Sequence, residues 1–206
     1  ALFGGALLLL PRRPLLAGVL FGLLTFKPQL GLLVPLALVA GGHWRAIVAA
    51  AAMLALLASA STALFGLAAW QAFLDQSPLA VQTMTLGWVG WEKMISAYAA
   101  LRLAGLDHVA AMAIHLVPAA LVAALVGVAW LPGSGTSHET RGAMVLTGAL
   151  IVTPFGLSYD LYLLAPAFAL VARRGLQDGF LPWEKTVIAA MFAMPILALA
   201  LMPAGL

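Results

Sequence analysis

The sequence contains no cysteine and very few charged residues. The lack of cysteine excludes disulfides, thiolate metal sites and cysteine nucleophiles. Only 8% of the 206 residues are charged, whereas 64% are hydrophobic, and the mean hydropathy is +1.08. A water-soluble chain of this length could not cover so much apolar surface, so the composition excludes a soluble domain.

Several functional signatures are also missing from the sequence. The formal net charge is +3, but no basic stretch with interleaved aromatic residues is present, so we expect no nucleic-acid partner. The HExxH, P-loop, GxSxG and glycine-rich dinucleotide patterns are absent as well. We therefore expect no metal and no cofactor.

The most prominent features of the sequence are long apolar runs, at 46–60, 109–131 and 187–202. Runs of this length are typical of membrane helices, and the absence of alternating polar strands favours helices over a barrel. The sequence predicts an all-α, polytopic membrane helix bundle that forms a single transmembrane domain over 1–206. The expected helices are 1–10, 14–26, 30–41, 46–68, 107–130, 143–157, 161–172 and 186–203, with a short interfacial helix in 94–104, an outer segment at 69–93 and a flexible loop at 131–142.

Two polar clusters interrupt the apolar sequence, Lys27-Pro28-Gln29 and Ser158-Tyr159-Asp160. We call them the Lys27 tip (27–29) and the Asp160 tip (158–160). The apolar flanks are too short to cross a membrane, which takes about 20 helical residues. Each cluster is therefore predicted to be the tip of a short helical hairpin, over 14–41 and 143–172. In a competing interpretation, 14–40 is one long helix kinked at Pro28.

The arginines favour the two hairpins. With hairpins, six of the seven arginines fall on one side of the membrane, which the positive-inside rule makes cytoplasmic. The single kinked helix would place Arg12 and Arg45 on opposite sides. Both tips and the segment 69–93 are then predicted to be extracytoplasmic. The six arginines are Arg12, Arg13, Arg45, Arg141, Arg173 and Arg174.

Lys27 is the first candidate for a functional residue. Placing an ionisable group as deep in the membrane as the tip of a short hairpin costs free energy. Such a group therefore usually marks a substrate or ion path. Pro28 breaks the helix directly after Lys27, and Gln29 adds a second hydrogen-bonding side chain. A cation beside the free amides of a helix N-terminus suits an anionic group such as a phosphate. The alternative is a lysine that only snorkels to the membrane surface.

Asp160 is the second candidate, and it lies between Tyr159 and Tyr162. Its structural alternative is an N-cap for a helix that begins at Leu161, because aspartate caps helices well. The two roles are compatible, since a capping carboxylate can also pair with Lys27 or accept a hydrogen bond from a sugar hydroxyl.

The segment 69–93 contains Trp70, Trp88 and Trp91 together with the pair Glu92-Lys93. Tryptophans at this height usually anchor a protein at the membrane interface. The alternative is a lid whose aromatic faces stack on a sugar. Glu92-Lys93 is interpreted as a solvated pair.

The stretches 22–46, 65–78, 90–106 and 153–174 resemble the C-terminal half of glycosyltransferase family 87. This family contains bacterial α-1,2-mannosyltransferases that use polyprenol-phosphate-mannose and have the GT-C membrane fold. The resemblance implies a GT-C-like fold and an inverting transfer of a hexose, mannose, from a polyprenol-phosphate sugar donor. The acceptor would be a lipid or glycan on the extracytoplasmic face of the bacterial plasma membrane.

The resemblance also implies roles for the two tips. The general base of the family is an aspartate in the first outer loop, upstream of this chain, so no catalytic residue is assigned here. We expect 1–206 to be a fragment that lacks this N-terminal part and is inactive alone. Lys27 and Gln29 would hold the donor phosphate, while Tyr159 and Asp160 would line the sugar pocket. The rival hypotheses are a polytopic transporter with broken helices and a non-catalytic membrane subunit.

Overall fold

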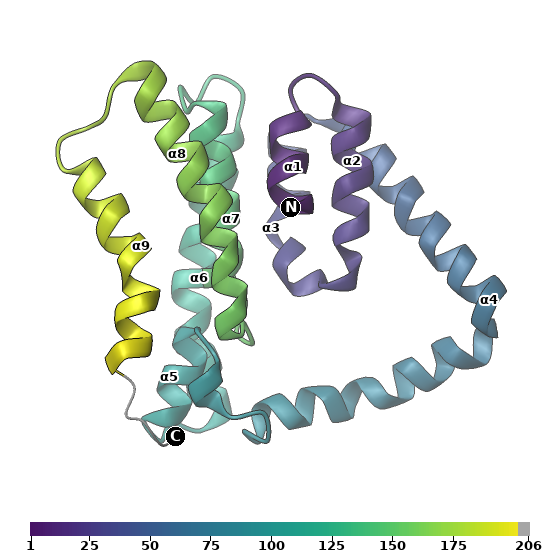
Figure 1. The fold of residues 1–206 in the computed structure, drawn as a ribbon. Helices are drawn as coiled ribbons and strands as arrows, with labels where there is room; N and C mark the ends of the chain where they lie inside the picture. Colours follow the sequence, from purple (N-terminus) through teal and green to yellow (C-terminus); the bar gives the residue numbers. More distant parts are fainter. Residues whose placement is uncertain (202–206) are drawn as a thin grey trace.

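The computed structural model describes residues 1–201, which form an all-α membrane bundle as predicted (Figure 1). Within this described part, α4 and α6 are long and apolar enough to cross a membrane. Short 3₁₀ helices lie between the α-helices at η1 (Leu24–Phe26), η2 (Pro28–Gly31), η3 (Trp91–Lys93) and η4 (Ser158–Leu163). The α-helices are α1 (Leu2–Leu9), α2 (Pro14–Leu23), α3 (Leu33–Ala40), α4 (Trp44–Thr85), α5 (Ala97–Leu103), α6 (His108–Trp130), α7 (His138–Val152), α8 (Leu164–Asp178) and α9 (Glu184–Leu201).

The two predicted hairpins are present. Helix α2 runs down the bundle, the chain turns through η1 and η2, and α3 runs back up (Figure 1). Lys27 joins the two 3₁₀ helices with φ −141° and ψ 68°, a non-helical conformation that the following proline favours. The second hairpin is formed by α7, η4 and α8. The single kinked helix is therefore excluded.

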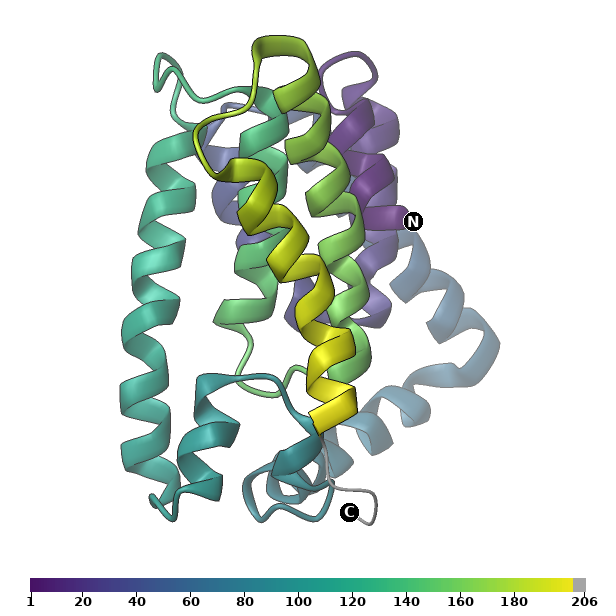
Figure 2. The same cartoon turned by 60° about the vertical axis from the view of Figure 1, so that its left-hand side comes forward.

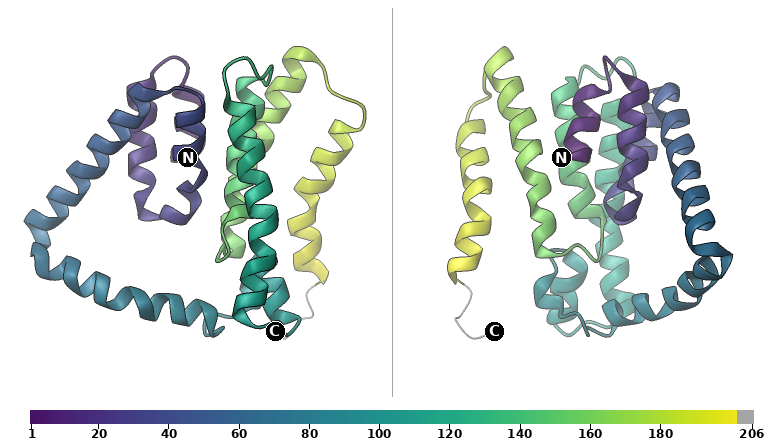
Figure 3. Two further views of the ribbon diagram at one scale, coloured as in Figure 1. Left: turned by 180° about the vertical axis from the view of Figure 1, so that it is seen from behind. Right: turned by 45° about the vertical axis from the view of Figure 1, so that its right-hand side comes forward.

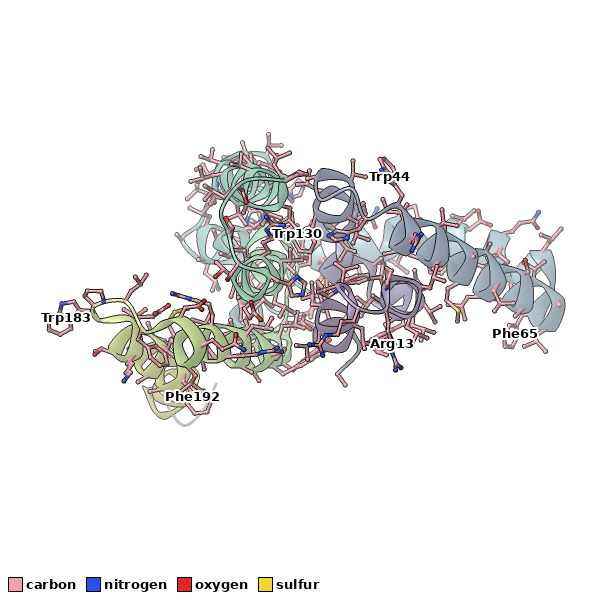
Figure 4. The ribbon with its side chains drawn as sticks, turned by 90° about the horizontal axis from the view of Figure 1, so that it is seen from above. Arg13, Trp44, Phe65, Trp130, Trp183 and Phe192 are labelled. Carbon is pink, nitrogen blue, oxygen red and sulfur yellow. The ribbon has the colours of Figure 1, made fainter. Side chains whose placement is uncertain are left out.

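The arginine-bearing segments gather at one end of the bundle. The connections α1–α2, α3–α4, α6–α7 and α8–α9 all lie at the upper end in Figure 1, opposite the two tips. Figure 4, which looks onto this end, shows Trp130 inside the bundle and Arg13 and Trp44 at its edge. Trp130 links two of these connections, because its indole N–H donates to the Arg141 carbonyl at 3.2 Å and its ring packs edge-on against His43.

Two helices extend beyond their predicted bounds at this end. Helix α7 begins at His138 instead of residue 143, because the Ser137 hydroxyl caps it by accepting the Thr140 N–H at 3.2 Å. Helix α8 continues to Asp178, and Arg174 pairs with Glu184 at 2.6 Å to link it with α9. Figure 2 shows α9 lying along α8, where Phe168 and Phe192 pack with ring centroids 6.1 Å apart.

Helix α4 differs most from the prediction, which ended a helix at residue 68. The helix continues to Thr85 and is broken at Gly66, whose φ of 77° and ψ of 168° are far from helical values. Glycine reaches this backbone conformation without the steric cost that a side chain would add. The second half of α4 therefore turns and runs across the lower end of the bundle (Figure 3). The segment 69–85 is helical rather than an outer loop.

Small residues let α2 and α4 pack closely. A Cβ atom at Gly18 would lie 2.3 Å from the Ala46 carbonyl oxygen, and one at Gly22 would lie 2.7 Å from Met53 Cβ. Glycines four residues apart allow two helix backbones to approach in this way inside a membrane. Because η1 follows α2 directly, this contact fixes the helix that leads into the Lys27 tip. The spacing is visible in the sequence, although we drew no prediction from it.

We expect Gly22→Ala to destabilise the protein. The added methyl group would overpack the helix contact against Met53 and the Ala50 carbonyl, which typically costs about 1–3 kcal/mol. Thermal unfolding in detergent measures the effect. Gly31→Ala is the matched control, since nothing lies within 4 Å of a Cβ atom there. Equal unfolding midpoints for the two variants would contradict the proposed packing.

The lower end is closed by α5 and the start of α6. Ser96 caps α5 by accepting the Ala99 N–H at 3.1 Å, and Asp107 caps α6 by accepting from Val109 and Ala110 at 2.8 and 3.0 Å. The hydrogen bond from the Ala110 N–H, and to a smaller extent the one from the Val109 N–H, holds the pKa of the Asp107 carboxyl below its usual value. The short helix predicted within 94–104 is thus present as α5 and is firmly capped.

Candidate functional site

The Lys27 and Asp160 tips meet in the bundle. The Lys27 ammonium forms an ion pair with Asp160 Oδ1, across 133 residues of sequence. The side chain of Asp160 is 1% exposed and that of Lys27 is 16% exposed. The two charges therefore converge on one place, as the sequence predicted. Their role in binding a substrate stays a prediction.

Asp160 caps its segment, but not at the predicted position. The helical turn begins at Ser158, so Asp160 lies inside η4 and does not precede a helix that starts at Leu161. From there Asp160 Oδ2 accepts the Leu157 N–H at 3.0 Å, while Oδ1 faces Lys27. A buried carboxylate is tolerated when it is both paired and hydrogen-bonded, as it is here.

Tyr159 and Gln29 complete the set of predicted site residues. Lys27 Nζ lies 4.1 Å from the centroid of the Tyr159 ring, a distance suited to a cation–π contact. The Tyr159 side chain is 59% exposed, so one part of its ring covers the ammonium while the rest faces outward. Gln29 lies in η2, partly exposed. The structure thus brings Lys27, Tyr159 and Asp160 into contact, while Gln29 lies two residues after Lys27 in the Lys27 tip.

The segment 86–96 packs against the chain just before the Asp160 tip. The Ile95 N–H donates to the Gly156 carbonyl at 2.9 Å, and Met94 forms an isolated antiparallel bridge with Leu157. The Ser96 hydroxyl also donates to the Pro154 carbonyl. These contacts hold residues 88–93, which precede Met94, beside Tyr159.

A hollow of ≈ 400 Å³ results between the two segments. Two exposed aromatic side chains, a lysine and a serine contribute to its wall, which therefore combines aromatic faces with polar groups. This mixture is typical of ligand sites. The lining residues are Trp88, Val89, Lys93, Leu157, Ser158 and Tyr159.

The tryptophans of the expected outer segment have different positions. Trp88 borders the hollow and is 67% exposed. Trp91 instead stacks on Arg102, 4.4 Å from ring centroid to guanidinium carbon, and donates to the Met84 carbonyl. Trp70 packs against Phe73 on α4. The lid interpretation therefore keeps support only at Trp88.

Lys93 is the residue that sequence reasoning missed. It was interpreted as half of a solvated Glu92-Lys93 pair, whereas it lies in the wall of the hollow together with Tyr159. The bridge between Met94 and Leu157, which holds Lys93 there, joins segments about sixty residues apart. No local pattern signals that contact.

An apolar groove begins at the Lys27 tip. It has a volume of ≈ 250 Å³ and is formed by α2, α3, α4 and the turn between the first two. Pro28, directly after Lys27, belongs to its wall, and Leu54 lies among its α4 residues. The charged cluster and an apolar groove are thus neighbours. Such a combination can hold a molecule with an anionic head and a lipid chain.

The described residues contain no cluster of His, Cys, Asp and Glu side chains that could hold a metal ion. A glycosyltransferase family 87 sequence model matches residues 1–154, a stretch that includes the Lys27 tip and Lys93 and ends before Asp160. Neither the curated proteins nor the solved structures compared with this chain give a match. The family match confirms the resemblance carried by the motifs, and the chain, a membrane glycosyltransferase, belongs to glycosyltransferase family 87.

Proposed function

We propose that this chain is part of a bacterial enzyme that transfers a hexose, mannose, from a polyprenol-phosphate donor. The acceptor is a lipid or glycan on the extracytoplasmic face of the plasma membrane. The observation that carries the proposal is that Lys27 directly precedes Pro28, which lines an apolar groove. A cation placed there suits a phosphate whose lipid chain occupies the groove.

The remaining residues of the site support a sugar next to that phosphate. Tyr159 offers an exposed aromatic face, and Ser158 contributes a hydroxyl to the wall of the hollow. Gln29 supplies an amide within the Lys27 tip. In this proposal Lys27 and Gln29 hold the phosphate, while Tyr159 and Asp160 line the sugar pocket.

The proposed reaction is an inverting displacement. The acceptor hydroxyl oxygen attacks the anomeric carbon, the bond from that carbon to the phosphate oxygen breaks, and polyprenol phosphate leaves with the electron pair. The acceptor proton goes to a general base, which the family resemblance places upstream of this chain. Asp160 is a poor candidate for that base, because both of its carboxylate oxygens already have partners.

Sugar transfer by the full-length enzyme tests the proposal. We expect the enzyme, reconstituted in liposomes with labelled polyprenol-phosphate-mannose and membrane-derived acceptors, to form a labelled glycoside. Movement of intact donor across the bilayer without a new glycosidic bond would instead support a transporter. An absence of both activities, in preparations that bind the donor normally, would support a non-catalytic subunit.

The proposed orientation predicts a labelling pattern. With single cysteines at Gln29, Ser158 and Ser137, an impermeant thiol reagent added to intact cells should label the first two positions and spare the third. The native chain has no cysteine to interfere. Because Ser137 precedes α7 at the end that carries the arginine segments, it should react only after the membrane is opened. Labelling of Ser137→Cys in intact cells would reverse the proposed orientation.

A further inference from the structure

We infer that Lys93 and Trp88 form a second binding site for the anionic head group of the lipid-linked sugar, next to the Lys27–Asp160 pair. This inference rests on the proposed function, because it takes the ligand to be a phosphate-linked lipid sugar. It adds a cation to which the sequence assigned no binding role, and it joins that cation to Trp88, which the lid interpretation offered as a sugar-stacking residue.

Lys27 is not free to bind an anion by itself. Its ammonium is already neutralised by Asp160, and the Tyr159 ring lies against it. A phosphate at Lys27 alone would have to compete with a carboxylate that is itself buried and cannot move into water. Separating such a pair leaves an uncompensated buried charge, which is strongly unfavourable. Lys27 can contribute to binding an anion, but it is poorly placed to bind one alone.

Lys93, in contrast, is not neutralised by a carboxylate in the described part of the chain. Its side chain is exposed, lines the hollow, and has no ion-pair partner within residues 1–201. The ammonium is therefore free to bind an incoming anion. The backbone just after it is held by the Met94–Leu157 bridge and the Ile95–Gly156 hydrogen bond. A charge on a fixed backbone loses less conformational freedom on binding than one on a mobile loop.

The hollow also offers aromatic side chains to a sugar. Trp88 lies between two turns, at Gly87 and Gly90, whose φ angles of 78° and 86° favour glycine. The next tryptophan, Trp91, is anchored on Arg102, so the turn that presents Trp88 is fixed from one side. Trp88 and Tyr159 then provide two exposed aromatic surfaces in one hollow of ≈ 400 Å³. Apolar ring faces of a sugar can pack on such surfaces while Lys93 pairs with the phosphate.

The two lysines should act on the same anion. Lys27 contacts the Tyr159 ring, and Lys93 shares the wall of the hollow with Tyr159. In this inference a single head group beside Tyr159 meets both positive charges. Losses from removing the two lysines should then be non-additive, as is usual for residues that share one partner.

Equilibrium binding of farnesyl phosphate to the full-length enzyme in detergent tests the inference. We expect Lys93→Ala to weaken binding about ten- to a hundredfold, which corresponds to one charge-assisted contact. Lys93→Arg should recover part of the affinity, because the charge survives. Lys185→Ala is the matched control, since Lys185 lies at the other end of the chain's fold and contacts Phe180. Farnesol, which lacks the phosphate, should bind all four proteins alike.

Several results would overturn the inference. One is a Lys93→Ala variant that binds farnesyl phosphate as tightly as the wild-type enzyme does. Another is a wild-type enzyme that binds farnesol as tightly as farnesyl phosphate. Equal competition by inorganic phosphate and farnesyl phosphate would assign the site to free phosphate and exclude a lipid head group. A different pattern would refute only the proposed donor: binding that depends on Lys93 together with no transfer from polyprenol-phosphate-mannose.

A ligand that carries a sugar tests the role of Trp88. With a short-chain prenyl-phosphate-mannose as probe, Trp88→Ala should raise the dissociation constant severalfold, while Trp88→Phe should keep most of the affinity because an aromatic face remains. Farnesyl phosphate, without a sugar, should bind Trp88→Ala normally. An equal loss for both probes would place Trp88 outside the sugar site.

Discussion

Sugar transfer by the full-length enzyme should fall about ten- to a hundredfold when Lys27 is replaced by alanine. The loss corresponds to one charge-assisted contact with the donor phosphate. Lys27→Arg should retain part of the activity, since the charge survives while the geometry changes. Lys27→Gln should resemble Lys27→Ala if charge is decisive. Initial rates at saturating and limiting donor measure the effect.

The ion pair complicates this experiment, because Lys27→Ala also leaves Asp160 buried without its partner. Breaking a buried pair from one side typically costs about 3–5 kcal/mol of stability. The double variant Lys27→Gln with Asp160→Asn removes both charges and should restore most of that stability. We expect it to fold and to remain inactive. Normal transfer by a folded Lys27→Ala variant would show that Lys27 does not bind the donor and serves only to neutralise Asp160.

Replacing Asp160 should give two separable effects. Asparagine keeps an oxygen that can accept the Leu157 N–H, but it loses the charge that faces Lys27. Alanine loses both contacts and leaves the partly buried Leu157 N–H without its acceptor, which costs up to about 1–3 kcal/mol more. We therefore expect Asp160→Asn to fold better than Asp160→Ala in thermal unfolding, while both transfer sugar poorly.

A comparison with Lys27 variants identifies the reason for the loss. If Asp160 acts by holding Lys27, the effects of Asp160→Asn and Lys27→Gln on donor KM should be strongly non-additive in a double-mutant cycle. Wild-type transfer by Asp160→Asn would mean that capping the turn is the whole role of this carboxylate. Additive losses would place Asp160 and Lys27 in independent roles.

Much of the fold follows from the sequence because it depends on local and averaged properties. The low charge content and the apolar runs require membrane helices, since only an internally hydrogen-bonded backbone is stable in lipid. Polar clusters between short apolar flanks predict hairpins, and the arginines place their tips at one end. Contact between Lys27 and Asp160 follows from these steps, because two isolated charges in one bundle favour each other.

Other features depended on the tertiary structure. The break of α4 at Gly66 and its continuation from residue 68 to Thr85 could not be predicted, because a single glycine either ends a helix or only bends it, according to the surrounding packing. The cap at Ser137 was visible in the sequence, but it lay in a stretch whose Gly, Ser and Thr content favoured a loop.

The site shows the same division. The sequence by itself determined that the chain is a membrane helix bundle, and it predicted Lys27 and Asp160 as residues of the functional site. Only the tertiary structure decided that Asp160 neutralises Lys27, that an apolar groove starts at Pro28, and that Lys93 joins Tyr159 around a hollow. These contacts connect residues far apart in the chain, and their geometry is set by helix packing and the Met94–Leu157 bridge, which no local sequence pattern encodes.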